Sequence, residues 1–230
     1  IVLDNNRKGS VDEFIKENTR KSATINVVSP LFTIYAYDKL SKVLETSSRV
    51  RFLFNEPTFI RKIETNQKEV KEFQLKMRER EKNISEFPYE IHLKNNLDQN
   101  QVANKCYQFI KNKAEVKSVI NPGVISSSNI SIHNADDSNY LISGSGINFT
   151  LDGLGYSNRV RWDFNTVLTE KNIVQEFVNF FESIWNNSSL VVDIKETLLD
   201  HIQNLYKENS PQLVYFVTLY HLFNEKLINM

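Results

Sequence analysis

Hydrophobic and β-branched residues cluster in three short segments near the start of the chain, which predicts strands over Ile1–Leu3, Thr24–Val28 and Val50–Phe54. Between these segments, apolar residues recur at helical spacing in Val11–Asn18 and Ile34–Leu44. An order of strand, helix, strand, helix and strand is typical of a mainly parallel sheet with helices on its faces. The first quarter of the chain therefore predicts an α/β fold.

The rest of the chain adds both kinds of element. The charged run Arg61–Lys82 has the spacing of a long surface helix, with a basic excess. Further helices are expected at Gln101–Ala114, Asn172–Trp185, Leu190–Tyr206 and Pro211–Ile228, and further strands at Val116–Ile120, Val124–His133, Tyr140–Ser143 and Val160–Phe164. We therefore expect a mixed sheet flanked by helices over residues 1–185, followed by a helical connector over residues 186–230.

Composition narrows the possible partners and compartments. The 28 basic and 28 acidic residues cancel, so no overall charge attracts nucleic acid or a membrane, and any such partner must meet a local patch. The one cysteine, Cys106, permits no internal disulfide, and its place in a predicted helix indicates a buried thiol in a reducing compartment. The polar N-terminus is unlike a signal peptide, and the apolar stretch Leu213–Phe223 is about half the ~20 residues that a bilayer crossing needs. We expect a cytoplasmic protein and, because the chain lacks an initial methionine, a fragment of a longer one.

Common nucleotide and metal motifs are missing from the sequence. No glycine is followed by lysine, which excludes a P-loop, and GxGxxG does not occur. The four histidines and Cys106 have no zinc-binding spacing. We therefore expect no metal and no bound cofactor in this chain.

Several segments together carry a family resemblance: Ser29–Tyr37, Phe52–Phe59, Gly144–Thr150, Gly153–Gly155 and Tyr206–Pro211. The chain resembles the phospholipase D-like (HKD nuclease-like) domain at the N-terminus of bacterial Swi/Snf-type helicases. The resemblance implies a phospholipase D-like mixed sheet flanked by helices and a C-terminal connector that leads into a helicase motor. It also implies a parent that uses ATP and Mg²⁺, and a homodimer, because one motif per chain makes half of such an active site.

The family's chemistry uses an HxK pair, an acidic residue, a GSxN run and a downstream carboxylate. Histidine attacks phosphorus, and lysine and asparagine neutralise the phosphate. Counting back from Asn148, the resemblance puts Ser127 at the histidine position and Asn129 at the lysine position. Asn134 stands near the acidic position, and Asp163 is a candidate for the downstream carboxylate. The motif is therefore degenerate, and neither Ser127 nor Asn129 can perform the family's reaction.

Two histidines are alternative candidates for the missing nucleophile. His92 starts a literal HxK with Lys94, but no GSxN follows it, and with four histidines in a lysine-rich chain such a match arises by chance about one time in three. His133 shares a predicted strand face with Ser127 and Asn129, although a strand-end histidine half in solvent is the more common explanation.

The resemblance implies an accessory domain that positions nucleic acid or pairs two copies of the protein without cleaving. We expect a weak, sequence-independent contact with nucleic acid through basic residues near the former active site. These are Arg159, Arg161, Lys111, Lys113 and Lys117, with Arg61–Lys82 as a second patch. Two alternatives stay open: an active phosphodiesterase with a displaced histidine, and a protein-interaction module whose contact surface is the apolar C-terminal helix.

Overall fold

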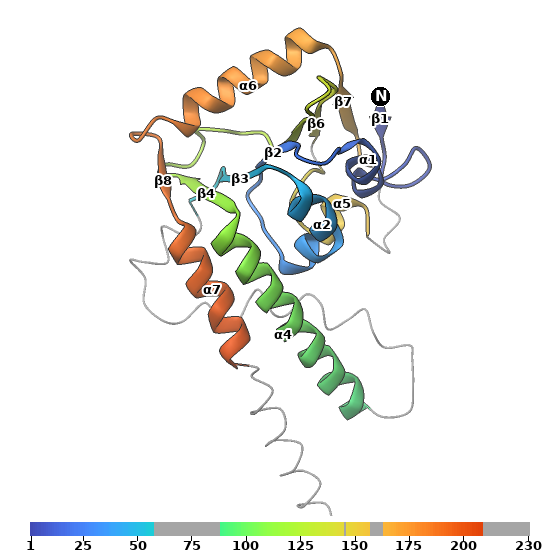
Figure 1. Cartoon of the computed structure of the whole chain (residues 1–230), viewed down its shortest axis with the longest axis vertical. Helices are drawn as coiled ribbons and strands as arrows, with labels where there is room; N and C mark the ends of the chain where they lie inside the picture. Colours follow the sequence, from blue (N-terminus) through green and yellow to red (C-terminus); the bar gives the residue numbers. More distant parts are fainter. Residues whose placement is uncertain (58–87, 145, 157–162, 209–230) are drawn as a thin grey trace, which may run out of the picture.

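The computed structural model describes residues 1–57, 88–144, 146–156 and 163–208, and within them the strands form one mixed sheet (Figure 1). The strand order is β1-β7-β6-β5-β2-β3-β4-β8. The bounds are β1 (Val2–Leu3), β2 (Thr24–Val28), β3 (Arg49–Phe54), β4 (Ala114–Val119), β5 (Asn129–His133), β6 (Asn139–Gly144), β7 (Asn165–Leu168) and β8 (Val191–Asp193). The predicted α/β class, with a mixed sheet flanked by helices, is confirmed.

The parallel part of the sheet is smaller than its opening pattern predicts. Strands β2, β3 and β4 run parallel to one another, whereas every other pairing in the described sheet is antiparallel. Strand β1 lies at the far edge, where Leu3 pairs with Asn165 of β7. The expectation of a mainly parallel sheet was therefore wrong, because only two of the three opening strands are neighbours.

Helices cover both faces of the sheet unequally. In the larger core, strand residues on one face of the sheet, among them Val27 and Phe52, pack against buried residues of five helices. These helices are α1 (Val11–Asn18), α2 (Ile34–Thr46), α4 (Pro88–Asn112), α5 (Leu151–Leu154) and α7 (Lys195–Glu208). The opposite face, with Val28 and Leu53, packs on α6 (Lys171–Trp185), which crosses the top of the view in Figure 1. Successive strand residues alternate between these two cores, as the period of a strand requires.

Local signals fix several helix ends. Ser10 and Glu13 form a reciprocal capping box at the start of α1, with each side chain accepting a hydrogen bond from the other residue's backbone N–H. Thr33 caps α2 by accepting from the Ala36 N–H at 3.2 Å. These caps explain why α1 and the start of α2 lie where the apolar spacing predicts them.

Three predicted elements differ from the observed ones. The strand predicted for Val124–His133 is shorter in the structure, where β5 begins at Asn129. Its partner β2 ends at Val28, so residues 124–128 have no residues of β2 to pair with. Within the predicted strand Val160–Phe164, residues 163 and 164 precede β7 rather than belonging to a strand. The predicted helix Leu190–Tyr206 is split into β8 and α7, because β-branched Val191 and Val192 pair with β4.

Some predictions fall partly or wholly outside the described residues. The helices predicted for Arg61–Lys82 and Pro211–Ile228 lie outside them, as do Arg159 and Arg161. The boundary between residues 185 and 186 stays a prediction, although β8 continues the sheet beyond it. Cys106 is fully buried on α4, which confirms the predicted core thiol. In the described part of the chain, no helix has the length and hydrophobicity to cross a bilayer.

Candidate functional site at the carboxyl end of the parallel strands

The residues predicted for the HxK positions lie where β2 and β3 end. Asn129 pairs with Val28, the last residue of β2, and is buried, whereas Ser127 is exposed in the segment before β5. Asn55, directly after β3, donates a 3.4 Å hydrogen bond from its side chain to the Ser127 carbonyl. The carboxyl ends of neighbouring parallel strands are the usual place for ligand sites in α/β sheets.

The second half of the motif reaches the same end of the sheet. The N–H of Phe149 donates to the Oγ atom of Ser29, the residue that follows β2, at 3.0 Å. Asn148 is therefore brought close to the end of β2 as well. A Cβ atom on Gly146 would lie 2.6 Å from the Asp163 Cγ atom, so Asp163 borders the same turn. The structure thus brings Ser127, Asn129, Asn148 and Asp163 to one region.

The chemistry available at these four positions is limited to hydroxyl, amide and carboxylate groups. Asp163 is buried and accepts a 2.8 Å hydrogen bond from the Asn5 side chain. The amide oxygens of Asn55 and Asn129 are buried without a hydrogen-bond partner. Amides exchange hydrogen bonds with a ligand, but they supply neither a nucleophile nor a proton at neutral pH. We call this region the carboxyl-end site. Its side chains can exchange hydrogen bonds with polar groups, but Ser127 and Asn129 do not supply the histidine and lysine that phosphodiester cleavage needs at the two predicted HxK positions.

Asn134 does not contribute to the carboxyl-end site; its side chain connects two loops. Its side chain accepts from the Arg20 N–H at 2.8 Å and donates to the carbonyls of Asn18 and Ser138 at 2.8 and 2.9 Å. It therefore ties the β5–β6 turn to the segment that follows α1. The residue near the predicted acidic position therefore holds two loops together.

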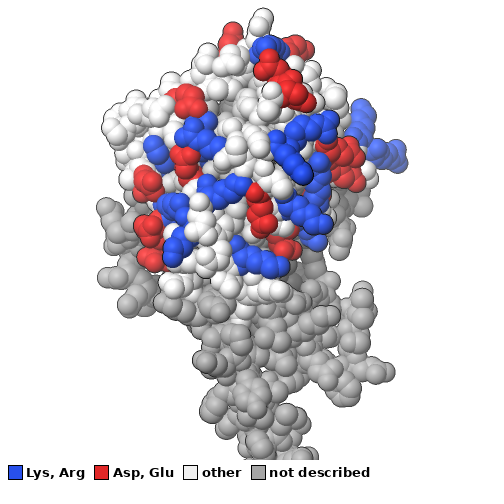
Figure 2. Space-filling view, viewed as in Figure 1, with Lys and Arg blue, Asp and Glu red and all other residues white. Residues whose placement is uncertain are grey.

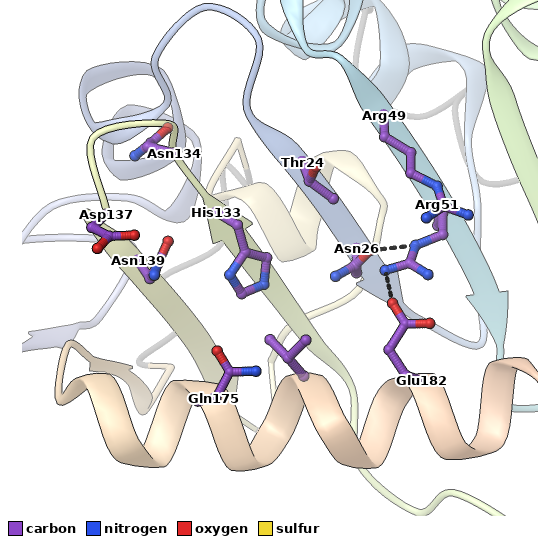
Figure 3. Close-up of a pocket in the computed structure, with 11 residues that line it drawn as sticks. Thr24, Asn26, Arg49, Arg51, His133, Asn134, Asp137, Asn139, Gln175 and Glu182 are labelled. Atoms are coloured by element: carbon purple, nitrogen blue, oxygen red, sulfur yellow. Dashed lines mark hydrogen bonds and ion pairs between the residues drawn. The ribbon is translucent and has the colours of Figure 1, made fainter.

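His133 lies four residues from Asn129 on β5, about 13 Å along the strand. It shares the strand face of Asn129 but belongs to a different cavity, a polar pocket of about 380 Å³ between the sheet and α6 (Figure 3). The lining residues are Thr24, Asn26, Arg49, Arg51, His133, Asn134, Asp137, Asn139, Gln175, Val178 and Glu182. We call this cavity the α6 pocket.

A hydrogen-bonded chain of side chains runs across the floor of the α6 pocket. His133 Nε2 lies 3.1 Å from the Ser131 Oγ atom, and Asn26 donates to the same oxygen at 3.0 Å. Arg51 donates from Nε to the Asn26 Oδ1 atom at 2.8 Å and pairs with Glu182 of α6 at 2.6 Å. The chain therefore links β5, β2, β3 and α6, as the dashed lines of Figure 3 show in part.

Electrostatics sets the protonation of this chain. Burial lowers the pKa of His133, and the nearby Arg51 cation lowers it further, which favours a neutral imidazole. The hydrogen bond from Arg51 lowers the pKa of the Glu182 carboxyl, which favours the carboxylate. Arg49 makes a bidentate pair with Glu115, with N–O distances of 2.6 and 3.0 Å. The positive charges of the pocket thus each have a carboxylate partner.

The lysines predicted to bind nucleic acid do not gather at the carboxyl-end site. Lys113 directly precedes β4, at the amino end of the parallel strands, and donates to the Glu45 carbonyl. Lys117 donates to the Trp185 carbonyl at 2.8 Å, with its Nζ atom 4.9 Å from the Trp185 ring centroid. Lys111 is exposed beside Tyr107. On the face shown in Figure 2, basic and acidic residues alternate without a large patch of one sign.

Apart from His133 and Asn134, the residues that line the α6 pocket were missed by the sequence analysis. Thr24 and Asn26, and likewise Arg49 and Arg51, are polar at every second position of strands whose other residues are apolar. This period-two signal was present, but it does not reveal which strands become neighbours. His92 lies on α4, far along the chain from the motif. Among the described residues, no group of three or more His, Cys, Asp or Glu side chains is placed to hold a metal ion.

Comparisons with known proteins give similarity to solved structures but not to sequences or family models. No family model matches the chain, and no curated protein matches it in sequence. The crystal structure of phosphatidylserine synthase from Haemophilus influenzae Rd KW20 is similar, with a TM-score of 0.47 and 13% sequence identity. The match covers 91% of this chain and 43% of that protein, so this chain spans less than half of its length. At this level of similarity, no residue role is transferred to this chain.

Proposed function

We propose that this chain is a phospholipase D-like accessory domain that contacts nucleic acid without cleaving it, beside the ATP- and Mg²⁺-dependent motor of a helicase. The observation that supports a domain without cleavage activity is that Asn129, at the position where the family has its lysine, is a buried amide. An amide has no charge with which to neutralise a phosphate in the transition state. The helicase motor and the nucleic-acid partner in this proposal are inferred from the sequence resemblance.

Absence of cleavage is tested with bis-p-nitrophenyl phosphate and with labelled single- and double-stranded DNA. We expect no turnover, since a serine hydroxyl is a weak nucleophile unless a general base activates it, and Asn129 supplies neither proton nor charge. Metal-independent turnover that disappears in His133→Ala or His92→Ala would replace this proposal with the displaced-histidine phosphodiesterase. His133 deserves that control because it shares the α6 pocket with Arg49 and Arg51.

Nucleic-acid binding is tested by fluorescence anisotropy of labelled duplex DNA across a salt series. A contact with two to four phosphates gives a log–log slope of roughly −2 to −4. The double variant Arg159→Ala/Arg161→Ala should weaken binding, whereas Lys171→Ala, which removes an exposed lysine from α6, is the matched control. Binding that is undetectable at low salt, or unchanged in the double variant, favours the protein-interaction module.

The same proposal includes a homodimer, because a phospholipase D-like active site with one motif per chain is completed by a second copy. The contact is expected around Ser127 and the turns from Gly144 to Gly155. Light scattering at micromolar concentration should give twice the 26.8 kDa of one chain. A monomer at all concentrations tested would remove dimerisation from the proposal.

A further inference from the structure

The guanidinium group of Arg51 is buried but only partly used. Its side chain is 3% exposed, its Nε atom donates to Asn26 at 2.8 Å, and its Nη2 atom pairs with the Glu182 Oε1 atom at 2.6 Å. The neighbouring Nη1 atom is buried and has no hydrogen-bond partner. The outer edge of the guanidinium therefore has two donor nitrogens, of which the carboxylate of Glu182 pairs with one.

An arginine in this state is suited to an oxyanion. The two outer nitrogens of a guanidinium form a planar fork that matches two oxygens of a carboxylate or phosphate. The fork is held in place by Asn26 and by two rings, since the guanidinium carbon lies 4.7 Å from the Phe181 centroid and 5.4 Å from that of Trp185. A ligand with two oxygens would satisfy the Nη1 donor that Glu182 leaves unpaired.

Glu182 can leave this position without unfolding the helix. Its side chain is 38% exposed, so a rotation of the side chain would take the carboxylate from Arg51 into solvent. The α6 pocket beside it has room for a small molecule and offers further donors from Thr24, His133 and Arg49 (Figure 3). The carboxylate of Glu182 therefore occupies a place that an external anion could take.

We propose that the α6 pocket binds a small oxyanion, the phosphate or carboxylate group of a compact molecule, on the Arg51 fork, and that Glu182 is the internal group that this ligand displaces. This site is separate from the carboxyl-end site, because Asn129 lies at the other end of β5. The proposal does not depend on nucleic-acid binding.

The test is isothermal titration calorimetry of the full chain with inorganic phosphate and, in a second series, acetate at constant ionic strength. In Glu182→Gln the competing charge is removed, so at least one of the two anions should bind about tenfold or more tightly than to the unmodified chain. Glu176→Gln is the matched control, because Glu176 lies exposed on the same helix and does not line the pocket. The anion with the larger gain identifies the preferred class.

A second measurement observes Arg51 directly, so that the test does not depend on whether an Arg51 variant folds. The ¹⁵Nε signal of Arg51, recognisable by the ring-current shifts of Phe181 and Trp185, should move on titration of Glu182→Gln with the bound anion. Arg51→Lys, where circular dichroism shows it folded, should lose the tighter binding. Equal affinity of Glu182→Gln, Glu176→Gln and the unmodified chain, or an Arg51 signal that stays fixed, would overturn the proposal.

Discussion

Gly146 packs so closely against Asp163 that a Cβ atom at residue 146 would lie 2.6 Å from the carboxyl carbon of Asp163. Gly146 is not among the residues with positive φ, so the requirement here is space rather than backbone conformation. Asp163 also accepts a hydrogen bond from the Asn5 side chain. The turn that carries Asn148 therefore depends on the absence of a side chain at residue 146.

We expect Gly146→Ala to lower the free energy of unfolding by about 1–3 kcal/mol, because the added methyl group forces Asp163 or the turn to shift. Urea denaturation measures the change. In a double-mutant cycle, Asp163→Ala should restore part of the loss, since it removes the atoms that clash. Full additivity of the two substitutions would show that the methyl group clashes with something else.

Asn134→Ala should cost about 2–3 kcal/mol of stability, because it leaves the Arg20 N–H and two loop carbonyls without their partner. The matched control is Lys171→Ala, which removes the exposed ion pair that Lys171 makes with Asp137 of the same turn. Thermal unfolding should separate the two variants clearly. Equal midpoints would contradict the structural role of Asn134.

The unfolding free energy should fall as the pH drops below about 6.5, the ordinary pKa of histidine. Burial lowers the pKa of His133 in the folded state, so the unfolded chain binds the proton more readily, and protonation stabilises the unfolded chain relative to the folded one. His133→Gln should lose less stability than the unmodified chain between pH 7.5 and 5.5 in urea titrations. The same loss in both chains would assign the pH dependence to other groups.

Cys106 should react with a thiol reagent such as DTNB at least about a hundredfold more slowly in the folded chain than in urea. The thiol is fully buried on α4, and burial raises its pKa. Absorbance at neutral pH follows the reaction, and Cys106→Ala gives the background. A fast reaction of the folded chain would mean that α4 separates readily from the core.

Much of the fold could be predicted where short-range signals decide. The predicted bounds of α1 and β2 rest on the spacing of apolar residues, and both match the observed bounds. The region after Leu190 was misassigned because a three-residue strand is set by its pairing with β4, which leaves little trace in local sequence. Helical spacing in the following residues then extended the predicted helix backwards.

The α6 pocket likewise depends on contacts between distant parts of the sequence, which local sequence patterns do not predict. Ser131 and Asn26 are 105 residues apart, and their contact exists only because β5 lies antiparallel to β2. Local sequence predicted both strands without fixing that pairing. In contrast, the motif count from Asn148 placed Asn129 and Asn148 together, and the structure brings both to the end of β2.

The two outermost strands of the described sheet are unusually brief, with two residues in β1 and three in β8. A long exposed edge would offer a row of free N–H and carbonyl groups on which a strand of another molecule could assemble. Here few such groups are available at either margin, which disfavours amyloid-like growth at high protein concentration. We accordingly expect a specific pairing of two molecules to use helices or turns of the described part rather than a continuous intermolecular sheet.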